Sequence, residues 1–338
     1  MSYTVSIIEG DGIGHEIVPA ALQVLEHTGV PFQWEFVPAG EKAVEKYQTP
    51  VPDITTDSIQ KNKLALKGPL TNLVGKGWPS PNVLLRKKLG LYAAVKRARY
   101  FEGVGSPFKD ADFLVVREAK EDTYAGAEQQ VGPDAAVAIK YITRDNSKNV
   151  ARFTFDLARR MGRKKVTITH KANVLKLTDG LFLKSAQEIA AEFPDIECES
   201  LMIDHLAFKL VKEPLTCDVI LALNVYGDIL ADLIAGICGS LGLGFGGNFG
   251  PDAALFEPVH GTAPTIAGQG IANPIGEILS GAMLLDYIGE HKAAALVETA
   301  VASVLKKGKC LTADLGGTAK TSDITKAIMD EMDLYKNK

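Results

Sequence analysis

Short apolar runs that alternate with amphipathic stretches dominate the sequence of this 338-residue chain. The runs are rich in strand-forming residues and fall at residues 3–8, 64–70, 113–117, 165–170 and 218–223. Apolar residues recur at helical spacing at residues 16–27, 149–161, 181–193, 278–288 and 293–305. Short continuous apolar runs are typical of buried strands, and their alternation with amphipathic helices predicts an α/β sheet protein.

Two aspartates follow the run at residues 218–223, on what we predict to be a helix. Asp228 and Asp232 are four residues apart, so on a helix they share one face, at the carboxyl edge of a parallel sheet. Two unpaired carboxylates there would repel each other, and Mg²⁺ or Mn²⁺, which prefers oxygen ligands, would remove the conflict. Acidic residues are also favoured at a helix start by the helix dipole, so the spacing alone leaves both interpretations open.

A glycine turn follows the first predicted strand. Residues 10–14 read G-D-G-I-G and lead into the helical stretch at 16–27. The third glycine is misplaced for the G-x-G-x-x-G fingerprint, so we reject a Rossmann dinucleotide site. A tight strand-to-helix turn is the better interpretation.

Composition narrows the class of protein. The length suffices for two domains, and 46% hydrophobic with 23% charged residues is ordinary for a globular chain. A net charge of −4 gives no reason to expect a nucleic-acid or anionic membrane partner, and we find no apolar run of about 18 residues that could span a membrane. The four cysteines contain no CxxC pair and are expected to be free thiols. We therefore expect a cytoplasmic location, with a mature mitochondrial matrix form as the alternative.

Cationic residues gather near predicted strand and helix ends. They are Arg86, Lys96, Arg97, Arg99 and Arg117. Taken singly, each is most simply a surface charge. Guanidinium groups suit two-point recognition of carboxylates, so a site that contains several of these residues would bind a polycarboxylate.

Several motifs together resemble the isocitrate and 3-isopropylmalate dehydrogenase family, the metal-dependent β-decarboxylating dehydrogenases. They occur in the family's order, from residues 10–14 through 224–250 to 314–317, and the resemblance covers nearly the whole chain. It implies an α/β, non-Rossmann, two-domain fold with a shared central sheet region. It also implies a discontinuous larger cofactor-binding domain, residues 1–98 plus 247–338, and a smaller substrate, metal and dimerisation domain, residues 99–246.

The resemblance assigns a set of substrate-binding residues. They are Ser80, Asn82, Arg86, Lys96 and Arg117. Lys96 stands where the family has arginine, and Arg97 stands where it usually has proline, so the planar fork is either lost or displaced by one residue. Ser80 and Asn82 can hydrogen-bond a distal carboxylate, whereas an isopropyl group would favour apolar residues there. The pattern therefore favours isocitrate.

Catalytic and metal-binding residues are implied in the same way. Tyr124 and Lys171 match the family's proton-transfer pair, and a tyrosine and a lysine of lowered pKa are suitable for that chemistry. Asp204, Asp228 and Asp232 match its metal ligands. In the family Lys171 and Asp204 serve the neighbouring subunit's site. A homodimer or higher oligomer with shared active sites is thus expected.

The cofactor residues implied by the resemblance lie mostly in one glycine- and proline-rich loop. They are Asn72, Glu257, His260, Gly261, Thr262, Ala263, Thr265, Ile266 and Asn273. Thr265 replaces the aspartate common in NAD-specific members, and no basic residue is present to bind the 2′-phosphate of NADP. NAD is favoured, with NADP possible.

The resulting hypothesis is an NAD-dependent isocitrate dehydrogenase that needs Mg²⁺ or Mn²⁺ and acts on a small 2-hydroxy tricarboxylate. Homoisocitrate, 3-isopropylmalate and tartrate are alternative substrates. A few positions depart from the family: Asn72, Ala119, Lys120 and Glu277, the last in place of an apolar residue. They leave open a second class of function, a regulatory subunit of an NAD-isocitrate dehydrogenase.

Overall fold

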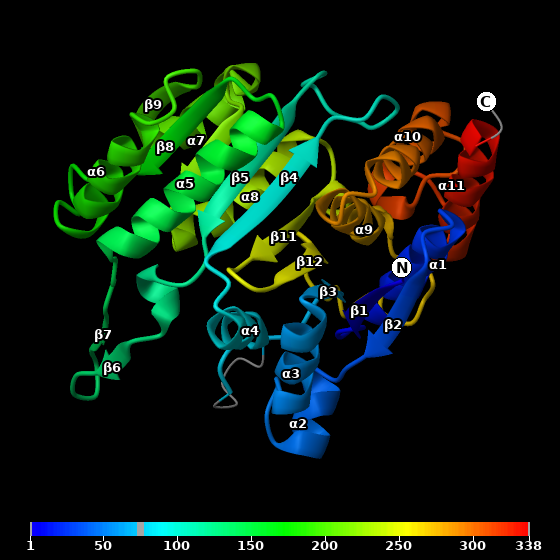
Figure 1. Ribbon diagram of the computed structural model, residues 1–338, viewed down its shortest axis with the longest axis horizontal. Helices are drawn as coiled ribbons and strands as arrows, with labels where there is room; N and C mark the ends of the chain where they lie inside the picture. The colour runs from blue at the N-terminus through cyan, green and yellow to red at the C-terminus, as the bar shows by residue number, and fades with distance from the viewer. Residues whose placement is uncertain (1, 73–77, 337–338) are drawn as a thin grey trace.

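The computed structural model describes residues 2–72 and 78–336. In that part of the chain one large mixed sheet has the strand order β2-β1-β3-β12-β11-β4-β5-β10-β8-β9 (Figure 1). Its strands are β1 (Tyr3–Ile8), β2 (Phe32–Phe36), β3 (Leu64–Lys67), β4 (Ala93–Arg99), β5 (Asp112–Glu118), β8 (Lys165–His170), β9 (Glu197–Met202), β10 (Val219–Ala222), β11 (Phe245–Phe249) and β12 (Ala254–Pro258). A separate hairpin pairs β6 (Glu128–Gln130) with β7 (Ala136–Ala138).

Helices account for most of the remaining ordered structure. The α-helices are α1 (Gly14–His27), α2 (Glu41–Tyr47), α3 (Asp53–Asn62), α4 (Pro81–Leu89), α5 (Arg144–Arg160), α6 (Thr178–Ala190), α7 (Ile203–Lys212), α8 (Asn224–Ile237), α9 (Ile275–Tyr287), α10 (His291–Lys307) and α11 (Thr321–Lys336). Short 3₁₀ helices are η1 (Asp122–Ala125), η2 (Pro214–Thr216), η3 (Leu241–Leu243) and η4 (Ala313–Leu315). None of the helices in residues 2–72 and 78–336 combines the length and apolar character needed to cross a membrane.

The direction of the strands changes only at the centre of the sheet. On one side β2, β1, β3 and β12 are parallel, and on the other β5, β10, β8 and β9 are parallel. The pairs β12–β11, β11–β4 and β4–β5 between them are antiparallel. Two parallel halves are thus joined through β4 and β11.

Both faces of the sheet are covered, which explains the continuous apolar runs. Along β5, Leu114 and Val116 pack into one core, whereas Phe113 and Val115 pack into another with residues of α7 and α8. Successive side chains of a strand point to opposite faces, so each face needs its own apolar set. A third core lies between β1, β3, α3 and α4.

The fold agrees closely with the pattern along the sequence. Each of the five predicted strands is a strand of the large sheet, and the five predicted helical stretches overlap α1, α5, α6, α9 and α10. The predicted domain boundaries, at 98/99 and 246/247, fall inside β4 and β11. The division into those two domains stays a prediction.

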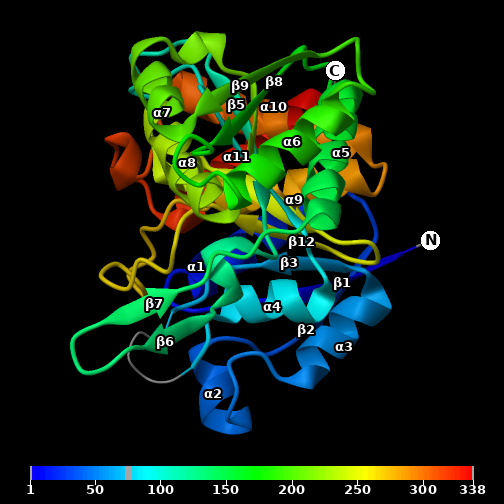
Figure 2. The ribbon, with the colours of Figure 1, turned by 90° about the vertical axis from the view of Figure 1, so that its left-hand side faces the viewer.

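Two surfaces expose apolar side chains. The β6–β7 arm extends away from the body of the molecule in both ribbon views, and it exposes Val131, Val137 and Ile139 (Figure 2). On α7 and α8, Phe208 is 62% exposed and Ile229 is 64% exposed. Large apolar side chains gathered on one surface commonly mark an interaction site.

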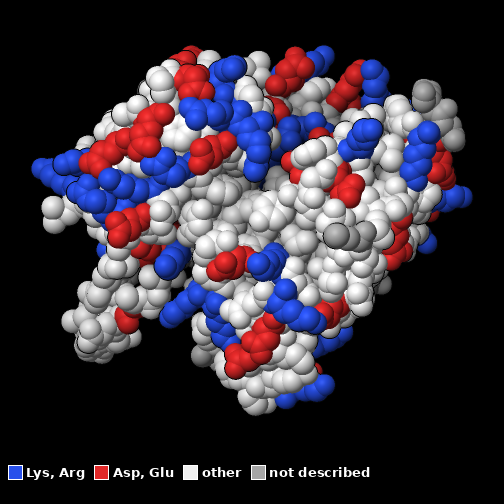
Figure 3. Space-filling model, in the orientation of Figure 1, with Lys and Arg blue, Asp and Glu red and all other residues white. Residues whose placement is uncertain are grey.

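Charged side chains of both signs are mixed over the face seen in Figure 3. Several of the basic ones lie on α5 and pair with acidic residues on or just after α6: Arg144 and Lys148 with Glu188, Arg152 with Glu192, and Arg159 with Asp195. Exposed pairs of this kind contribute little individually, about 0–1 kcal/mol each. They link two neighbouring helices.

Candidate active site

A cavity of about 170 Å³ lies where the two halves of the sheet meet. Its charged and polar lining consists of Lys67, Asn72, Asn82, Arg86, Lys96, Arg117, Asp228, Asp232, Glu257 and His260. These residues come from β3, α4, β4, β5, α8 and β12 and from the loops that follow β3 and β12. The cavity therefore brings together groups that are far apart in the sequence.

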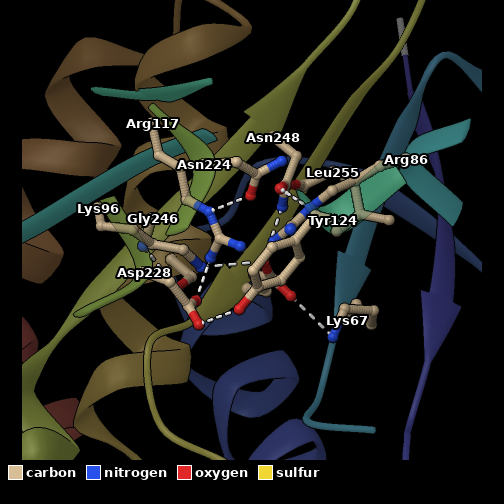
Figure 4. Close-up of polar contacts among 12 residues, drawn as sticks. Lys67, Arg86, Lys96, Arg117, Tyr124, Asn224, Asp228, Gly246, Asn248 and Leu255 are labelled. Atoms are coloured by element: carbon tan, nitrogen blue, oxygen red, sulfur yellow. Dashed lines mark hydrogen bonds and ion pairs between the residues drawn. The ribbon is translucent and has the colours of Figure 1, made fainter. Parts of the chain in front are cut away.

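Arg117, Tyr124 and Asp228 converge at one side of the cavity, as Figure 4 shows. The hydroxyl of Tyr124 donates to Oδ2 of Asp228 at 2.5 Å, and the guanidinium of Arg117 pairs with Oδ1 of the same carboxylate. Nε of Arg117 also donates to Oδ1 of Asn224 at 2.8 Å. Burial, and then the hydrogen bond to Asp228, raise the pKa of Tyr124.

A glycine sets the position of this cluster. A Cβ atom added at Gly227 would lie 2.6 Å from Cβ of Arg117, a separation that real Cβ atoms essentially never show. The missing side chain lets the first turn of α8 pack directly on the end of β5. Asp228, the next residue, is thereby held beside Arg117.

Asp228 and Asp232 lie on α8 and both line the cavity, as their spacing predicts. Partial burial and the neighbouring carboxylate of Asp228 raise the pKa of Asp232. The pair therefore has the electrostatic conflict that a divalent cation would relieve, and its carboxylate oxygens suit Mg²⁺ or Mn²⁺. The donor set fits such an ion.

Asp204 and Lys171 lie elsewhere. Nζ of Lys171 donates to Oδ1 of Asp204 at 2.5 Å, and neither residue lines the cavity. Within residues 2–72 and 78–336, no three ligating carboxylate, imidazole or thiol groups are close enough to hold a metal ion. Asp204 of the same chain thus does not join Asp228 and Asp232.

A buried anion, Glu257, also lines the cavity and contacts several cations there. Its Oε2 accepts from Nζ of Lys67 at 2.8 Å, and its Oε1 accepts from Nζ of Lys96 at 2.9 Å. Asn248 donates to Oε1 at 2.8 Å, and the guanidinium of Arg86 approaches to 3.7 Å. Burial alone would raise the pKa of Glu257, but the three cations hold it well below its usual value.

Burial acts on the cations as well. It lowers the pKa of Lys96, and, with the neighbouring charge of Arg117, it lowers the pKa of Arg86 to about 10. The charge of Glu257 opposes this lowering of the pKa at both side chains. The cavity is therefore rich in positive charge and suited to carboxylates.

The arginine fork at this site is lost and not displaced by one residue. Lys96 and Arg97 are adjacent on β4, so their side chains point to opposite faces. Lys96 lines the cavity, whereas Arg97 makes a two-point ion pair with Asp112. Arg99 pairs with Glu298 at 3.1 Å and does not line the cavity either.

Ser80, which is predicted to bind the substrate, does not line the cavity. It is the N-cap residue of α4 and is not among the residues that line the cavity, whereas Asn82 and Arg86 of the same helix are. Oδ1 of Asn82 is buried without a hydrogen-bond partner in the part of the chain that the structure describes. This oxygen is available to a bound molecule.

A second cavity of about 660 Å³ adjoins the first. It is lined by Ile13, Ser240, Leu241, Gly242, His260, Gly261, Ala263, Ile266, Ile271, Asn273, Ala313 and Asp314. His260 and Gly261 line both cavities. The size and the mainly apolar lining are typical of a cofactor site.

The turn at residues 10–14 supports this second cavity. The backbone N–H of Ile13 donates to the carbonyl of Thr262 at 3.0 Å, and a Cβ at Gly12 would come within 2.1 Å of that oxygen. Gly12 has φ of +55°, a conformation that glycine adopts readily. The turn thus supports the loop that contains Thr262, and its sequence lacks the G-x-G-x-x-G fingerprint of a phosphate-binding turn.

His260 offers a free polar group at the junction of the two cavities. Its Nδ1 lies 3.0 Å from the carbonyl of Gly261, and its Nε2 is buried without a partner among the described residues. Burial lowers the pKa of His260, which favours the neutral ring. His260 lines both cavities, and its unpartnered ring nitrogen fits a dinucleotide that spans them.

The predicted cofactor residues divide between the cavities. Asn72 and Glu257 line the first cavity, and His260 and Gly261 line both. Three more of the predicted residues, Ala263, Ile266 and Asn273, line the second cavity alone. Thr262 lines neither cavity, and its backbone carbonyl accepts the hydrogen bond from the N–H of Ile13. The side chain of Thr265 is exposed and does not line either cavity.

Some residues of these cavities escaped the sequence analysis. Lys67 is a lysine inside an apolar strand, and that break in the pattern is a signal that could have identified it. Asp314 belongs to a motif that supports the family resemblance, and it accepts hydrogen bonds from Ser240 and Asn273. Asn248 lines neither cavity but donates to Glu257, and it carries no local signal, because only the pairing of β11 with β12 brings the two residues together.

Comparisons with known proteins agree with this geometry. The family described as isocitrate/isopropylmalate dehydrogenase matches residues 4–328. A probable isocitrate dehydrogenase [NAD] subunit alpha, mitochondrial, of Drosophila melanogaster is 42% identical over 324 residues, which cover 96% of this chain and 86% of the relative. Catalytic subunit 5 of the mitochondrial isocitrate dehydrogenase [NAD] of Arabidopsis thaliana is 41% identical over 97% of this chain and 88% of the relative.

A solved structure gives the same result. The crystal structure of isocitrate dehydrogenase from Methylococcus capsulatus is 48% identical, with a TM-score of 0.95, and the match covers 98% of this chain and 99% of the other. The predicted α/β fold is therefore confirmed. The chain belongs to the isocitrate/isopropylmalate dehydrogenase family.

Proposed function

We propose that this chain catalyses the NAD-dependent oxidative decarboxylation of isocitrate to 2-oxoglutarate and CO₂, with Mg²⁺ or Mn²⁺ as the metal. The observation that carries the proposal is the convergence of three buried cations, Arg86, Lys96 and Arg117, with the aspartate pair of α8 in one cavity. A substrate for such a cavity needs several carboxylates and an oxygen group for the metal. Isocitrate has both.

The cations bind and orient the substrate. Charge-assisted hydrogen bonds from Arg86 and Arg117 to carboxylates are strong in a site from which water is largely excluded. The side-chain N–H₂ of Asn82 and the hydroxyl of Ser80, the N-cap residue of α4, are the groups proposed to donate to the distal carboxylate. Their polarity supports isocitrate over a substrate with an isopropyl group.

Asp228 and Asp232 would hold the metal of their own subunit, with Asp204 supplied by a neighbour. When bound, the metal would act as a Lewis acid on the substrate oxygen, and the nicotinamide of NAD would accept the hydride. Arg117 and Tyr124 keep the carboxylate of Asp228 oriented in the cavity. Asp228 is therefore held in place before the ion arrives.

Proton transfer falls to Tyr124 and Lys171. Oxidation removes the hydroxyl proton and gives a β-keto acid, and loss of CO₂ then requires a proton to return to carbon. Tyr124 does not itself line the cavity, but its hydroxyl donates to Asp228, which does, and it is proposed as the proton donor. Lys171, which pairs with Asp204 outside the cavity, is proposed as the base supplied by the partner subunit.

The shared site implies a homodimer or a larger homo-oligomer. The exposed apolar side chains of the β6–β7 arm and of α7 and α8 support an extensive subunit contact. Asp204 lies on α7 itself, at the second residue of the helix. A partner that packs on α7 and α8 would bring both proposed residues near a neighbouring site.

NAD is the proposed cofactor. The relatives described above carry NAD in their names, and His260, Gly261, Ala263, Ile266 and Asn273 line a cavity of suitable size. Glu257, which adjoins both the cations and the loop of His260, is proposed to face the nicotinamide. The described cysteines are free thiols, which supports a reducing compartment, the cytoplasm or a mitochondrial matrix.

The regulatory-subunit hypothesis is the second candidate. The departures at Asn72, Ala119 and Lys120 favour it, and so does Lys96 in place of an arginine. Against it stand the retained Tyr124, Lys171 and aspartates, and the words "catalytic subunit" in one relative's name. We favour an active enzyme.

The test is a steady-state assay of the purified chain alone. Isocitrate, homoisocitrate, 3-isopropylmalate and tartrate are compared by kcat/KM, each with NAD and with NADP in the presence of Mg²⁺. Isocitrate with NAD should give the highest value. A preference for 3-isopropylmalate would overturn the role of Asn82, and inactivity with all four would favour the regulatory subunit.

A further inference from the structure

A buried ion triad outside both cavities has no role in the function proposed above. Lys140 lies between β7 and α5, and its ammonium is 2.7 Å from Oδ1 of Asp179 and 3.5 Å from Oδ1 of Asp122. Both aspartates are almost fully buried, and the lysine side chain is 15% exposed. None of the three residues lines either cavity. Buried ions give little net stability compared with apolar packing, so a role in fixing positions is the better interpretation.

Asp122 joins the element that carries Tyr124 to the helix that carries Asp228. It is the first residue of η1, and its Oδ1 accepts from the backbone N–H of Thr123 at 2.9 Å. Its Oδ2 accepts from the backbone N–H of Val225, the second residue of α8, at 3.1 Å. Asp122 also has a φ of +69°, which a residue other than glycine keeps where its surroundings impose it. Asp122 thus fixes the start of η1, and with it Tyr124, against α8.

Asp179 acts in a similar way on the residue that follows β8. It is the second residue of α6, and its Oδ2 accepts from the backbone N–H of Lys171 at 2.7 Å. The same oxygen accepts from the hydroxyl of Tyr226 on α8 at 3.1 Å. The ammonium of Lys140 lies over the ring of Tyr226, 4.7 Å from its centroid. Asp179 therefore holds the backbone of Lys171 at the end of β8.

We propose that Lys140 is a positioning residue for both members of the proton-transfer pair. Through Asp122 it holds the element of Tyr124, which serves the site of its own subunit. Through Asp179 it holds Lys171, which serves the site of the neighbouring subunit. The inference rests on the proposed sharing of active sites between subunits. Under that arrangement one side chain acts on two sites and couples them.

Loss of the ammonium should disturb both sides of the triad. Lys140→Met keeps an unbranched side chain and leaves two buried carboxylates without their cation. Such groups move toward water or take up a proton. Either response weakens the hydrogen bonds that Asp122 and Asp179 accept from the backbone. Lys140→Gln keeps a neutral donor for one of the carboxylates and is the milder variant.

The experiment uses mixed dimers of Lys171→Met chains with Tyr124→Phe chains, in which one of the two sites keeps both intact residues. In that site Tyr124 comes from the Lys171→Met chain, and Lys171 comes from the Tyr124→Phe chain. Lys140→Met is then added to one chain at a time. Added to the first chain, it tests the effect on Tyr124. Added to the second chain, it tests the effect on the Lys171 supplied to the neighbour.

Each addition should lower turnover per mixed dimer about tenfold at saturating isocitrate, NAD and Mg²⁺, the effect of losing one charge-assisted hydrogen bond. Lys148→Met is the matched control, because that lysine of α5 pairs with Glu188 of α6 at 2.8 Å and both side chains are partly exposed. It should leave turnover nearly unchanged in either chain. Native mass spectrometry counts the mixed dimers. A merely structural role would lower their number and not the turnover of each.

Unchanged turnover in either arm would overturn the inference, because Lys140 would then serve at most one member of the pair. Lys140→Gln keeps the test decisive if the methionine variant folds poorly, since it should give smaller losses in the same two arms. The parent mixture provides the separate check on the proposed function. Mixed dimers that form without Lys140→Met and stay inactive would contradict the shared site, and the inference with it.

Discussion

The hydroxyl of Tyr124 donates a hydrogen bond to the carboxylate of Asp228 at 2.5 Å, while Arg117 holds the other oxygen of that carboxylate. Tyr124 comes from a short 3₁₀ helix and Asp228 from α8, 104 residues later. A proposed proton donor and a proposed metal ligand are thus directly coupled. Replacement of either residue should therefore remove this hydrogen bond and alter the position of the other side chain.

Metal dependence follows from the aspartate pair. Replacement of Asp228 by asparagine should lower kcat/KM by at least about a hundredfold, in line with the loss of a catalytic metal's charge stabilisation. Excess chelator should abolish turnover of wild type, and added Mg²⁺ or Mn²⁺ should restore it. The Glu298→Gln variant serves as the control for folding and general charge. Full activity in excess chelator would contradict the metal assignment.

The separation of Lys171 from Tyr124 predicts subunit complementation. Lys171→Met and Tyr124→Phe should each be severely impaired as homo-oligomers. Refolded together as dimers, they should regain up to roughly a quarter of wild-type activity, because random pairing makes half the dimers mixed and each mixed dimer has one intact site. The measurement is activity against mixing ratio.

Native mass spectrometry provides the control for that experiment by counting mixed dimers. Recovered activity should follow their abundance and peak at equal amounts of the two variants. Mixed dimers that form and stay inactive would show that Lys171 and Tyr124 act within one chain.

Much of the fold could be predicted because the strands are buried on both faces. β10 is a continuous apolar run, β8 has four apolar or β-branched residues between Lys165 and His170, and both strands lie where predicted. The position of Asp228 beside Asp232 likewise follows from helical spacing. Local pattern was sufficient wherever the periodicity of one element decided the outcome.

Other features depend on contacts that no local pattern contains. The choice between Lys96 and Arg97 requires the orientation of β4, and only the structure shows that Arg97 turns toward Asp112. Lys67 could not be connected with Glu257 without the parallel pairing of β3 and β12. Asp204 does not line the cavity of its own chain. A contact between subunits, which would bring it to a neighbouring cavity, leaves no pattern in the sequence of one chain.

Glu118 provides a prediction about pH and stability. Burial raises its pKa from 4.5 to about 7, despite hydrogen bonds to one of its oxygens from the backbone of Lys120 and Glu121 and from Asn146. The folded protein therefore binds this proton more tightly than the unfolded chain does. The associated stability is fully present below about pH 4.5 and is lost as pH rises through about 7.

Glu118→Gln should remove that loss. Its amide oxygen can still accept the same hydrogen bonds, and it has no charge to desolvate. The variant should match wild type near pH 4.5 and exceed it above pH 7 by up to about 3 kcal/mol, estimated from the pKa difference. Denaturant unfolding across this pH range is the measurement. Parallel curves for the two proteins would refute the assignment to Glu118.

Cofactor choice can be shifted at Thr265. An aspartate there would accept hydrogen bonds from the ribose hydroxyls of NAD and would repel the 2′-phosphate of NADP. Thr265→Asp should raise the ratio of kcat/KM for NAD to that for NADP by about tenfold, the value of one charged hydrogen bond. Thr265→Asn, which lacks the charge, is the control and should change the ratio less. A ratio unchanged by the aspartate would place the ribose away from this residue.

The pairing of β3 with β12 has a consequence for how the protein folds while the ribosome synthesises it. The two strands are parallel neighbours, yet about 190 residues separate them along the chain. Synthesis proceeds at about 5–20 residues per second, so roughly 10–40 s pass between the synthesis of β3 and that of its partner β12. During that time one edge of the β2-β1-β3 group is open to pairing with other chains, whereas β5, β8, β9 and β10 can assemble once residue 222 has emerged. The nascent chain should therefore depend most on chaperones before residue 258 leaves the exit tunnel.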